Sequence, residues 1–421
     1  MKKVILPALL SFGLLYASTF VYAAAGSLDP TFGTGGKVET GFGNNGRPAD
    51  AVLQLDGKLV VAGTFDNFQV ATQVFGVVRY LSSGKLDTTF GKRGFATTNF
   101  TNFINSVSSM ALQPNGKIVV AGTAMSADGT LSEFAIARFN SNGSLDSTFG
   151  SGGHVTTNFV GVQLGGVSNP ANAVLLQPDN KILVGGLASQ CAKCIHYTAL
   201  ARYNSNGSLD TTFGTGGKVT VQAIGPVYTL ALDSNGNIFA VNGTAAVEFN
   251  SSGTLASTPA ATIVASSHPG ISAFQPDGKF VVSGVAQGPS GRRDIDVKVS
   301  RFTSNGGADF TFQNSPFDFG AGGPFSNVGQ AVALQPDGQI VVGGISQTAS
   351  FGNIFGLARL NSDGNLDQNF GAGGVLTTQF FAADQVLALV VQTDGKIIAV
   401  GQTLNPNTQL ADVALARYIG R

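Results

Sequence analysis

Eleven carboxylates of this sequence, Asp50 among them, stand outside its repeated motifs, and four of these aspartates could do acid–base chemistry. A hydrolase or lyase acting on a polysaccharide or peptide can use one carboxyl group as an acid and a second as a base. Such a pair would come from four residues, if the fold brought two of them to one face: Asp66, Asp128, Asp294 and Asp384. No nucleophile elbow, phosphate-binding loop or His-Glu-x-x-His motif indicates another kind of catalysis.

Two cysteines are the other reactive groups. Cys191 and Cys194 are separated by two residues, and in an exported chain this spacing favours a local disulfide. Covalent haem attachment requires His directly after the second Cys, where Ile195 stands. A zinc site would need a fourth ligand beyond the two thiolates and His196, and His154 is a remote candidate. We therefore expect no metal and no cofactor.

Aromatic and amide side chains occur between the expected strands and suit non-covalent binding. Aromatic faces can stack on a sugar or peptide while neighbouring amides donate and accept hydrogen bonds. The alternative is that most of these phenylalanines pack inside the fold. The candidate ligand-binding residues are Phe65, Asp66, Asn67, Phe68, Asn99, Phe100, Asn102, Phe103, Phe159, His196, Tyr197, Arg292, Arg293, Asp294, Phe351, Asn353, Phe380, Phe381 and Asp384.

Composition excludes several classes of protein. The 421 residues include 24 Lys plus Arg and 24 Asp plus Glu, so the chain lacks the strong positive field that drives nucleic-acid binding. Hydrophobic residues make up 43% of the chain and charged residues only 11%, which is not the composition of a disordered protein. Glycine is abundant, with 57 residues and no strict three-residue period, which indicates many turns.

The first residues have the pattern of an export signal. Lys2 and Lys3 precede a stretch, residues 4–20, that is almost wholly apolar or small. We expect a signal peptide over 1–23 with cleavage after Ala23, and Ala25 is an alternative site. An uncleaved membrane anchor is the other interpretation. No later stretch is long and apolar enough to span a membrane, so the mature chain is expected outside the cell, at its surface or in the periplasm.

Three markers recur in fixed order through the rest of the chain. Leu-Asp-x-x-Phe-Gly occurs over residues 28–33, 86–91, 145–150, 209–214 and 366–371, with a degraded copy over 308–313. Gln-Pro-Asp-Gly-Lys or a variant begins at Gln54, Gln113, Gln177, Gln275, Gln335 and Gln392, with a degenerate copy at Asp233. Ala-Arg-Tyr/Phe or a variant places arginine at Arg79, Arg138, Arg202, Arg301, Arg359 and Arg417, with Glu248 in the fourth copy. The period is about 57 residues, within the range of solenoids and propellers.

Each repeat has the pattern of four short strands. In the second repeat the expected strands are residues 109–113, 117–122, 134–140 and 154–157, separated by turn sequences such as Asn-Gly. No helical periodicity of useful length occurs in the mature chain. Seven such units predict an all-β domain over 26–421, a seven-bladed β-propeller of four-stranded blades. An open β-solenoid is the alternative, although it would need capping ends.

The two ends of the chain each hold part of a repeat. The last repeat stops at Arg417 and Tyr418 after its third strand, whereas residues 36–40 form a fourth strand with no repeat before them. The N-terminal strand is therefore expected to complete the last blade and to remove two exposed sheet edges. In five repeats Arg precedes Asp by eight residues, as in Arg79 and Asp87. Because Arg417 has no downstream Asp and Asp29 no upstream Arg, we expect these two to pair across the closure.

The combination of Leu-Asp-x-x-Phe-Gly-x-x-Gly, Gln-Pro-Asp-Gly-Lys-Ile-Val-Val-x-Gly and Ala-Leu-Ala-Arg-Tyr-Asn resembles the delta-60 repeat family. The resemblance covers essentially residues 27–421 and implies an exported bacterial propeller. That family has no established activity and no catalytic residue set, so no chemistry is carried over to this chain. The fourth repeat departs most, since it lacks the Arg, the Asp and the Phe-Gly.

The strand order separates two faces of the expected propeller. Uniform tight turns join strands one and two, and strands three and four, on one face. Variable loops join strands two and three, and successive blades, on the other face, where function is usually located. The leading hypothesis is a monomeric, non-catalytic binding or scaffold protein whose variable face holds a surface glycan, peptide or protein. The propeller hydrolase or lyase is the alternative, and a purely structural envelope component is a third possibility.

Overall fold

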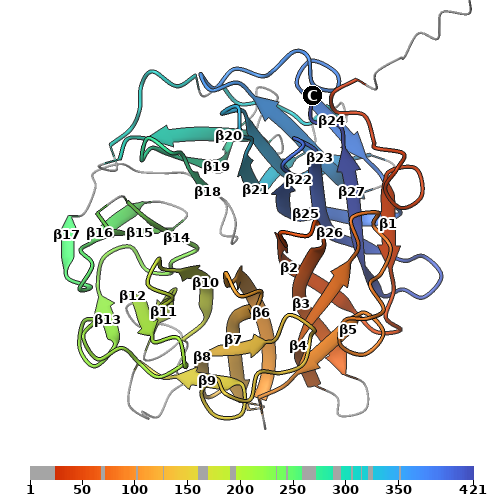
Figure 1. Cartoon of the computed structure of the whole chain (residues 1–421). Helices are drawn as coiled ribbons and strands as arrows, with labels where there is room; N and C mark the ends of the chain where they lie inside the picture. The colour runs from red at the N-terminus through yellow and green to blue at the C-terminus, as the bar shows by residue number, and fades with distance from the viewer. Residues whose placement is uncertain are drawn as a thin grey trace, which may run out of the picture.

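The protein is a ring of antiparallel sheets in a computed structural model (Figure 1). The described residues form seven sheets and no helix, which confirms the predicted seven-bladed all-β propeller. The structure describes residues 24–67, 72–100, 103–126, 128–159, 169–189, 196–233, 235–242, 245–257, 272–287, 295–304, 307–313, 315–320, 326–349 and 352–421. The expected signal peptide over 1–23 and the two cysteines, Cys191 and Cys194, lie outside these residues.

Within each blade the strands follow the chain outward from the ring axis. Blades one to three contain β2 (Gly46–Leu53), β3 (Leu59–Asn67), β4 (Thr72–Tyr80) and β5 (Phe95–Thr98); β6 (Phe103–Leu112), β7 (Ile118–Ser126), β8 (Ser132–Phe139) and β9 (His154–Thr157); and β10 (Ala171–Leu176), β11 (Ile182–Ala188), β12 (Tyr197–Tyr203) and β13 (Lys218–Val221). Blades four and five contain β14 (Thr229–Leu232), β15 (Ile238–Val241), β16 (Ala246–Phe249) and β17 (Leu255–Ser257); and β18 (Ser272–Phe274), β19 (Phe280–Gln287) and β20 (Ile295–Phe302). Blades six and seven contain β21 (Asn327–Leu334), β22 (Ile340–Thr348), β23 (Gly352–Leu360) and β24 (Val375–Thr378); and β25 (Ala382–Val391), β26 (Ile397–Leu404), β27 (Ala411–Tyr418) and β1 (Lys37–Thr40).

The hydrophobic core is divided among the junctions between blades. The second strand of a blade is a continuous apolar run because both of its faces are covered; Val60 and Val61, for example, are fully buried. Val60 packs in one cluster with Val120 of blade two, while Val61 packs in another with Val400 of blade seven. Each blade is therefore stabilised mainly by its two neighbours, and the ring has to close to bury every sheet face.

The N-terminal strand closes the ring. β1 pairs with β27 in an antiparallel register that sets Lys37 opposite Ala416 and Thr40 opposite Val413. Blade seven thus has the order β1-β27-β26-β25, with both ends of the chain in one sheet. This arrangement confirms the predicted closure, which leaves no unpaired edge between the first and last repeats.

Arginine side chains tie the third strand of one blade to the next blade. Arg79 donates from Nε to Asp87 Oδ2 at 2.9 Å and from Nη1 to the carbonyl oxygen of Ser141, in blade two, at 2.6 Å. Its guanidinium carbon lies 4.5 Å from the ring centroid of Phe90, in the range of a cation–π contact. Lys58 adds a second cation to Asp87 at 3.8 Å. We call this set of Arg, Asp, Phe and the next blade's carbonyl the arginine clamp.

The clamp recurs six times among the described residues. The Nε–Oδ2 distance is between 2.6 and 2.9 Å in every copy, and the guanidinium carbon lies 4.4 to 4.7 Å from the phenylalanine ring. Each guanidinium donates to a main-chain carbonyl of the following blade. The six pairs are Arg79–Asp87, Arg138–Asp146, Arg202–Asp210, Arg301–Asp309, Arg359–Asp367 and Arg417–Asp29.

The pair Arg417–Asp29 carries the clamp across the closure. Arg417 donates to Asp29 at 2.9 Å and to the carbonyl oxygen of Ser82, in blade one, at 2.6 Å. Burial alone would raise the pKa of Asp29, but hydrogen bonds from Thr31 and the charges of Lys396 and Arg417 lower it to about 2. Asp29 is therefore ionised at neutral pH, and its negative charge is balanced by two cations.

Blades four and five depart from the repeat. Glu248 and Ala256 occupy the Arg and Asp positions of blade four, so the described residues show no clamp between blades four and five. Among the described residues the sheet of blade five has three strands. Beside β20 the chain forms isolated bridges, Val297 with Phe317 and Phe302 with Ala308, instead of a fourth strand. The local sequence differs as well: residues 313–316 read Gln-Asn-Ser-Pro, where blade six has Gly-Ala-Gly-Gly with positive φ at Gly371 and Gly374.

Bulges in the innermost strands explain why the second strand of a blade holds a glycine, such as Gly122 in β7. In β6 one extra residue stands between Val107 and Ser109, which pair with Gly122 and Ala121 of β7. The bulge brings the carbonyl oxygen of Ser106 so close that a Cβ on Gly122 would overlap it. The same register shift occurs in the innermost strands of blades one, three, six and seven. A glycine is thus required where the second strand meets the bulge.

Removing the closing arginine is expected to destabilise the whole ring. Arg417→Ala should lower the free energy of unfolding by about 3–5 kcal/mol, because it leaves the buried carboxylate of Asp29 without its main partner. Urea unfolding followed by circular dichroism measures this. Arg421→Ala is the matched control: Arg421 is 60% exposed and lies 3.6 Å from Asp337, so its loss should cost less than about 1 kcal/mol. Equal stability of the two variants would contradict the account of closure.

The bulge contact predicts a second difference in stability. Gly122→Ala should cost about 3 kcal/mol, because the added methyl group meets main chain that cannot move aside. In the matched control, Gly185→Ala, the methyl group meets only side-chain atoms, the nearest being Val227 Cγ1 at 2.9 Å. That control should cost about 1 kcal/mol. A similar loss in both variants, measured by urea unfolding, would show that the bulge imposes no special constraint.

Candidate functional site

Two of the aromatic side chains expected at a binding face are instead part of the core. Phe65 is fully buried and packs edge-on against Phe42 and Phe95, with ring centroids 5.4 and 4.7 Å away. Phe100 is 6% exposed and lies edge-on to Phe75 and His154. Both rings thus fill space within and between blades, and neither is exposed for a ligand to contact.

A phenylalanine that follows the fourth strand packs against the next blade's fourth strand. Phe159 has Lys218 Nζ 6.0 Å from its ring centroid, and Phe380 has Lys37 Nζ at 5.3 Å. Each lysine also donates to a nearby main-chain carbonyl, as Lys37 does to Gln379 at 3.1 Å. These contacts assign Phe159 and Phe380 to the joints between blades.

The acid–base candidates accept hydrogen bonds from groups of their own loops. Asp384 is fully buried and accepts hydrogen bonds from the main-chain N–H of Phe380 at 2.7 Å and from Thr403 Oγ1 at 2.5 Å; burial raises its pKa. Hydrogen bonds from Ser126 and Thr130 lower the pKa of Asp128 to about 2.

Asp66 accepts hydrogen bonds from Asn45 at 2.5 Å and from Gln73 at 3.2 Å. It lies on blade one, whereas Asp128 lies on blade two and Asp384 on blade seven. No hydrogen bond joins any two of these three described carboxylates. The three carboxylates thus form hydrogen bonds within separate loops of three different blades.

The remaining candidates divide into surface residues and residues outside the description. Asn99, His196 and Phe381 are exposed on the loop face, while Tyr197 and Asn353 are half-buried. Asn67 and Phe103 lie in β3 and β6, and only their main chain is described. The candidates outside the described residues are Phe68, Asn102, Arg292, Arg293, Asp294 and Phe351.

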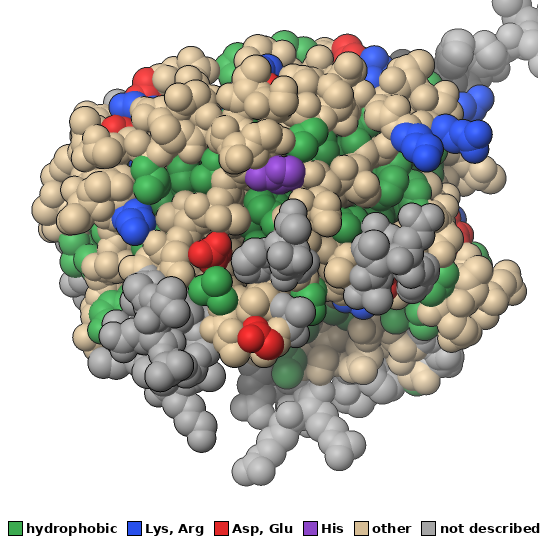
Figure 2. All heavy atoms as spheres, turned by 90° about the horizontal axis from the view of Figure 1, so that it is seen from below, with side chains coloured by type: hydrophobic (Ala, Val, Ile, Leu, Met, Phe, Trp, Pro, Cys, Tyr) green, Lys and Arg blue, Asp and Glu red, His purple; other side chains and the backbone are tan. Residues whose placement is uncertain are grey.

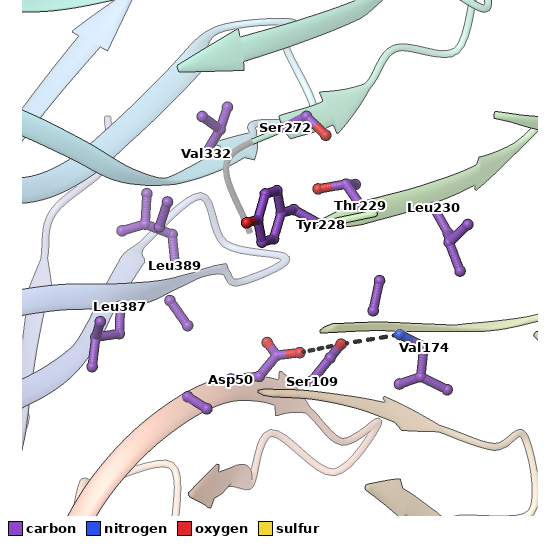
Figure 3. A pocket seen from close by; sticks show the side chains of 14 residues that line it. Asp50, Ser109, Val174, Tyr228, Thr229, Leu230, Ser272, Val332, Leu387 and Leu389 are labelled. Carbon is purple, nitrogen blue, oxygen red and sulfur yellow. Dashed lines mark hydrogen bonds between the residues drawn. The ribbon is translucent and has the colours of Figure 1, made fainter. Parts of the chain in front are cut away.

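A cavity on the ring axis is a better candidate site than the predicted aromatic cluster. It has a volume of about 170 Å³ and is lined by innermost strands from every blade. Figure 3 shows Asp50 and Tyr228 projecting into this space from different blades. Apolar side chains form much of the rest of the wall, among them Val174, Val332 and Leu389. We call this space the axial cavity.

Asp50 is held by donors from blades one and two. Its Oδ1 accepts the N–H of Ala51 at 2.7 Å, and its Oδ2 accepts the N–H of Met110 at 2.9 Å and Ser109 Oγ at 3.2 Å. Ser109 Oγ in turn accepts the N–H of Val174, in blade three, at 3.3 Å (Figure 3). A series of hydrogen bonds thus links three innermost strands and holds the carboxylate of Asp50 toward the ring axis.

The environment of Asp50 raises the pKa of its carboxyl group, which is still mainly ionised at neutral pH. Burial raises the pKa of Asp50 to about 6, and the hydrogen bonds from Met110, Ala51 and Ser109 only partly oppose this effect. No lysine or arginine lines the axial cavity within the described residues, and none forms an ion pair with Asp50. A raised carboxyl pKa in a cavity is a feature common at functional sites.

Sequence reasoning counted Asp50 among the carboxylates outside the repeat but did not select it. The available signal was positional. Four residues before the Gln-Pro-Asp-Gly marker only the first repeat places an acid; the fifth repeat places Ile271, and the others place small or hydroxyl residues. The equivalent residues in the described chain are Ser109, Ala173, Thr229, Ala331 and Ala388.

The fold and the axial cavity define a β-propeller protein assembled from sequence repeats. Four segments match the model of a family described as "Domain of unknown function (DUF5122) beta-propeller": residues 54–90, 113–149, 177–213 and 335–370. Each segment runs from the glutamine of the second marker to the phenylalanine of an arginine clamp. In these segments the chain is similar to a propeller-repeat family, and the match assigns no activity.

Comparisons with known proteins found distant structural similarity only. The chain is similar to a streptogramin B lyase with 10% identity and a TM-score of 0.44, over 90% of this chain and 97% of that one. It is similar to the α-L-arabinanase of Penicillium chrysogenum complexed with arabinobiose, with 10% identity and a TM-score of 0.44 over 93% of this chain and 96% of that one. It is similar to the polysaccharide lyase Uly1, with 9% identity and a TM-score of 0.45 over 91% of this chain and 98% of that one. No curated protein matched, and no activity is carried over from these structures.

The described residues contain neither a metal-binding cluster nor a membrane-crossing helix. No three His, Cys, Asp or Glu side chains in the described part come together to hold a metal ion. No helix in that part is long and apolar enough to cross a bilayer. The wall of the ring seen in Figure 2 carries only scattered charges among uncharged side chains. Electrostatic attraction over a broad surface therefore does not single out a partner on that side.

The pKa of Asp50 predicts how stability depends on pH. The folded chain should bind a proton at Asp50 near pH 6, whereas an unfolded aspartate binds one near pH 4. The native state therefore takes up more protons between these values, so acidification favours folding at this site. The free energy of unfolding of the protein minus that of Asp50→Asn should rise by roughly 2 kcal/mol between pH 7 and pH 4. A difference that stays constant would show that Asp50 titrates normally.

Proposed function

We propose that this chain is an exported, non-catalytic binding propeller of the delta-60 repeat type. Its ligand, a surface glycan, peptide or protein, contacts the loop face and reaches the axial cavity. The observation that carries this proposal is that the described carboxylates have different structural roles. Those of the clamps join blades, those of Asp66, Asp128 and Asp384 hold loops, and Asp50 alone among the described carboxylates lines the cavity.

The two faces of the ring support this choice of surface. On one face the clamps and the uniform turns of the second marker repeat from blade to blade, as in the turn Gln113–Lys117. On the other face the connections differ, from residues 379–381 between β24 and β25 to residues 158–170 between β9 and β10. A rigid scaffold with variable loops on one side is the usual arrangement of a binding surface.

The enzyme alternative needs an acid–base pair. A hydrolase or lyase requires a second group near the first, within reach of the same substrate bond. Asp50 has hydroxyl neighbours but no second described carboxylate or imidazole beside it in the axial cavity. The competing hypothesis therefore rests on Asp66, Asp128, Asp294 and Asp384, of which Asp294 lies outside the described residues. Turnover of a bound oligosaccharide or peptide that is lost in Asp294→Asn would favour that hypothesis.

A pair of exposed phenylalanines tests which face binds. Phe381 is 37% exposed on the loop face of blade seven, and Phe310 is 94% exposed on the turn side of blade five. The protein would be applied to arrays of bacterial and host oligosaccharides and of peptides, and affinities for the positive spots measured by titration. Phe381→Ser should weaken binding by about tenfold or more, since an aromatic contact at the centre of an interface is commonly worth that much.

The matched control is Phe310→Ser, which should leave affinity unchanged. Both variants remove an exposed ring, so neither is expected to unfold the protein. Loss of binding in Phe310→Ser with normal binding in Phe381→Ser would place the ligand on the turn face and contradict the proposal.

A further inference from the structure

We propose that the axial cavity binds a primary alkylammonium group, with its nitrogen at Asp50 Oδ1 and its methylene chain against the apolar wall. This inference rests on the proposed function and deepens it by naming the chemistry that the axis recognises. It is carried by the charge, the free hydrogen-bonding capacity, the wall and the size of the axial cavity.

Within the described residues, no cation compensates the charge of the axial cavity. Asp50 is the single charged side chain among the described residues that line it. Its hydrogen-bond donors are two main-chain N–H groups and a hydroxyl, all of them neutral. A carboxylate held away from water is normally paired with a cation. In every clamp, by contrast, the carboxylate contacts an arginine, as Asp87 does with Arg79. Asp50 is thus built as a carboxylate and lacks a cationic partner within the described chain.

The hydrogen-bonding pattern leaves room for one more donor. Oδ2 of Asp50 already accepts two hydrogen bonds, whereas Oδ1 accepts one, from Ala51 at 2.7 Å. Each oxygen of a carboxylate can accept two, so Oδ1 retains one acceptor site. An ammonium group brings three donors. The hydroxyl of Thr229, also in the cavity wall, has no hydrogen-bond partner among the described residues and is a second acceptor.

The wall suits a short alkyl chain that ends in a cation. Tyr228 presents an aromatic ring to the axial cavity (Figure 3), and aromatic faces attract ammonium groups. Val174, Val332 and Leu389 supply apolar surface for methylene groups. A metal ion would need several oxygen ligands, and Asp50 is the only carboxylate among the described residues of the lining.

The axial cavity is large enough for a small ligand, with a volume of about 170 Å³. A four-carbon chain with a terminal ammonium has five heavy atoms and fits this volume. Such a group is found in n-butylammonium and at the end of a lysine side chain. The shared chemistry is therefore a primary ammonium on a chain of about four methylene groups.

The direct test uses n-butylammonium as the probe. The purified chain labelled with ¹⁵N would be titrated with n-butylammonium chloride at pH 7.5, and the amide signals of Ala51 and Met110 followed by NMR. These amides donate to Asp50, so occupation of the carboxylate should shift them in a saturable way. n-Butanol, the neutral analogue of the same length, should shift them at least tenfold less at equal concentration. Equal responses to amine and alcohol would overturn the proposal.

Variants separate recognition of charge from general apolar binding. Asp50→Asn should weaken n-butylammonium binding at least tenfold, whereas Asp128→Asn, an exposed loop aspartate, should leave it unchanged. Since Asp50→Asn could disturb the innermost strands, Val332→Phe provides a second route. It keeps Asp50 but fills the axial cavity, and it should also abolish binding. Undiminished binding in either Asp50→Asn or Val332→Phe would overturn the assignment.

Two further experiments complete the test. One identifies the source of the amine, and the other separates this inference from the proposed function. Competition by Nα-acetyl-lysine amide would identify a lysine side chain of a peptide or protein, and failure to compete would identify a free small amine. Array ligands that bind in a manner dependent on Phe381 while n-butylammonium does not bind would overturn this inference alone. The loop-face proposal would then stand.

Discussion

The structure depends on a guanidinium group that serves two blades at once. Each clamp arginine uses Nε for the aspartate of its own blade and Nη1 for a main-chain carbonyl of the next, while its flat face covers a phenylalanine. Lysine could not replace it, because a single ammonium lacks the fixed fork that directs donors to two acceptors. A buried ion pair gains little by itself. Here additional hydrogen bonds and the aromatic contact offset desolvation, and the geometry sets how one blade meets the next.

Much of the fold could be predicted because the constraint is periodic. Arg and Asp stand eight residues apart in several repeats, as in Arg79 and Asp87, and this constant spacing predicted an ion pair. One copy is divided between the two chain ends, as Arg417 and Asp29, and it predicted where the ring closes. The contact from Arg79 to Ser141 was not predictable, since it joins residues of two repeats that become neighbours only in the ring. Blade five also escaped prediction, because its missing turn glycines are a departure from the pattern that supported the prediction of four strands.

The candidate site was harder to predict than the fold. Phenylalanines at the ends of fourth strands look like binding residues in the sequence, but Phe100 and Phe380 pack in the joints between blades. Asp50 looks ordinary in the sequence, and its burial arises only when innermost strands from all blades surround the axis. Local sequence reports on contacts within a repeat. A site made by one residue from each of several repeats appears only after the ring has closed.

The arginine clamp also explains why one junction should differ from the others. Among the described residues no clamp joins blade four to blade five, and these two blades share a small cluster built around Val241, Phe280 and Phe302. Hydrogen exchange in the native state, read by mass spectrometry strand by strand, tests the central claim most directly. If the clamps hold the ring together, amides of β14–β16 and β18–β20 should exchange through openings of clearly lower free energy than amides of β3, β7 and β22. Uniform protection across all blades would contradict the account.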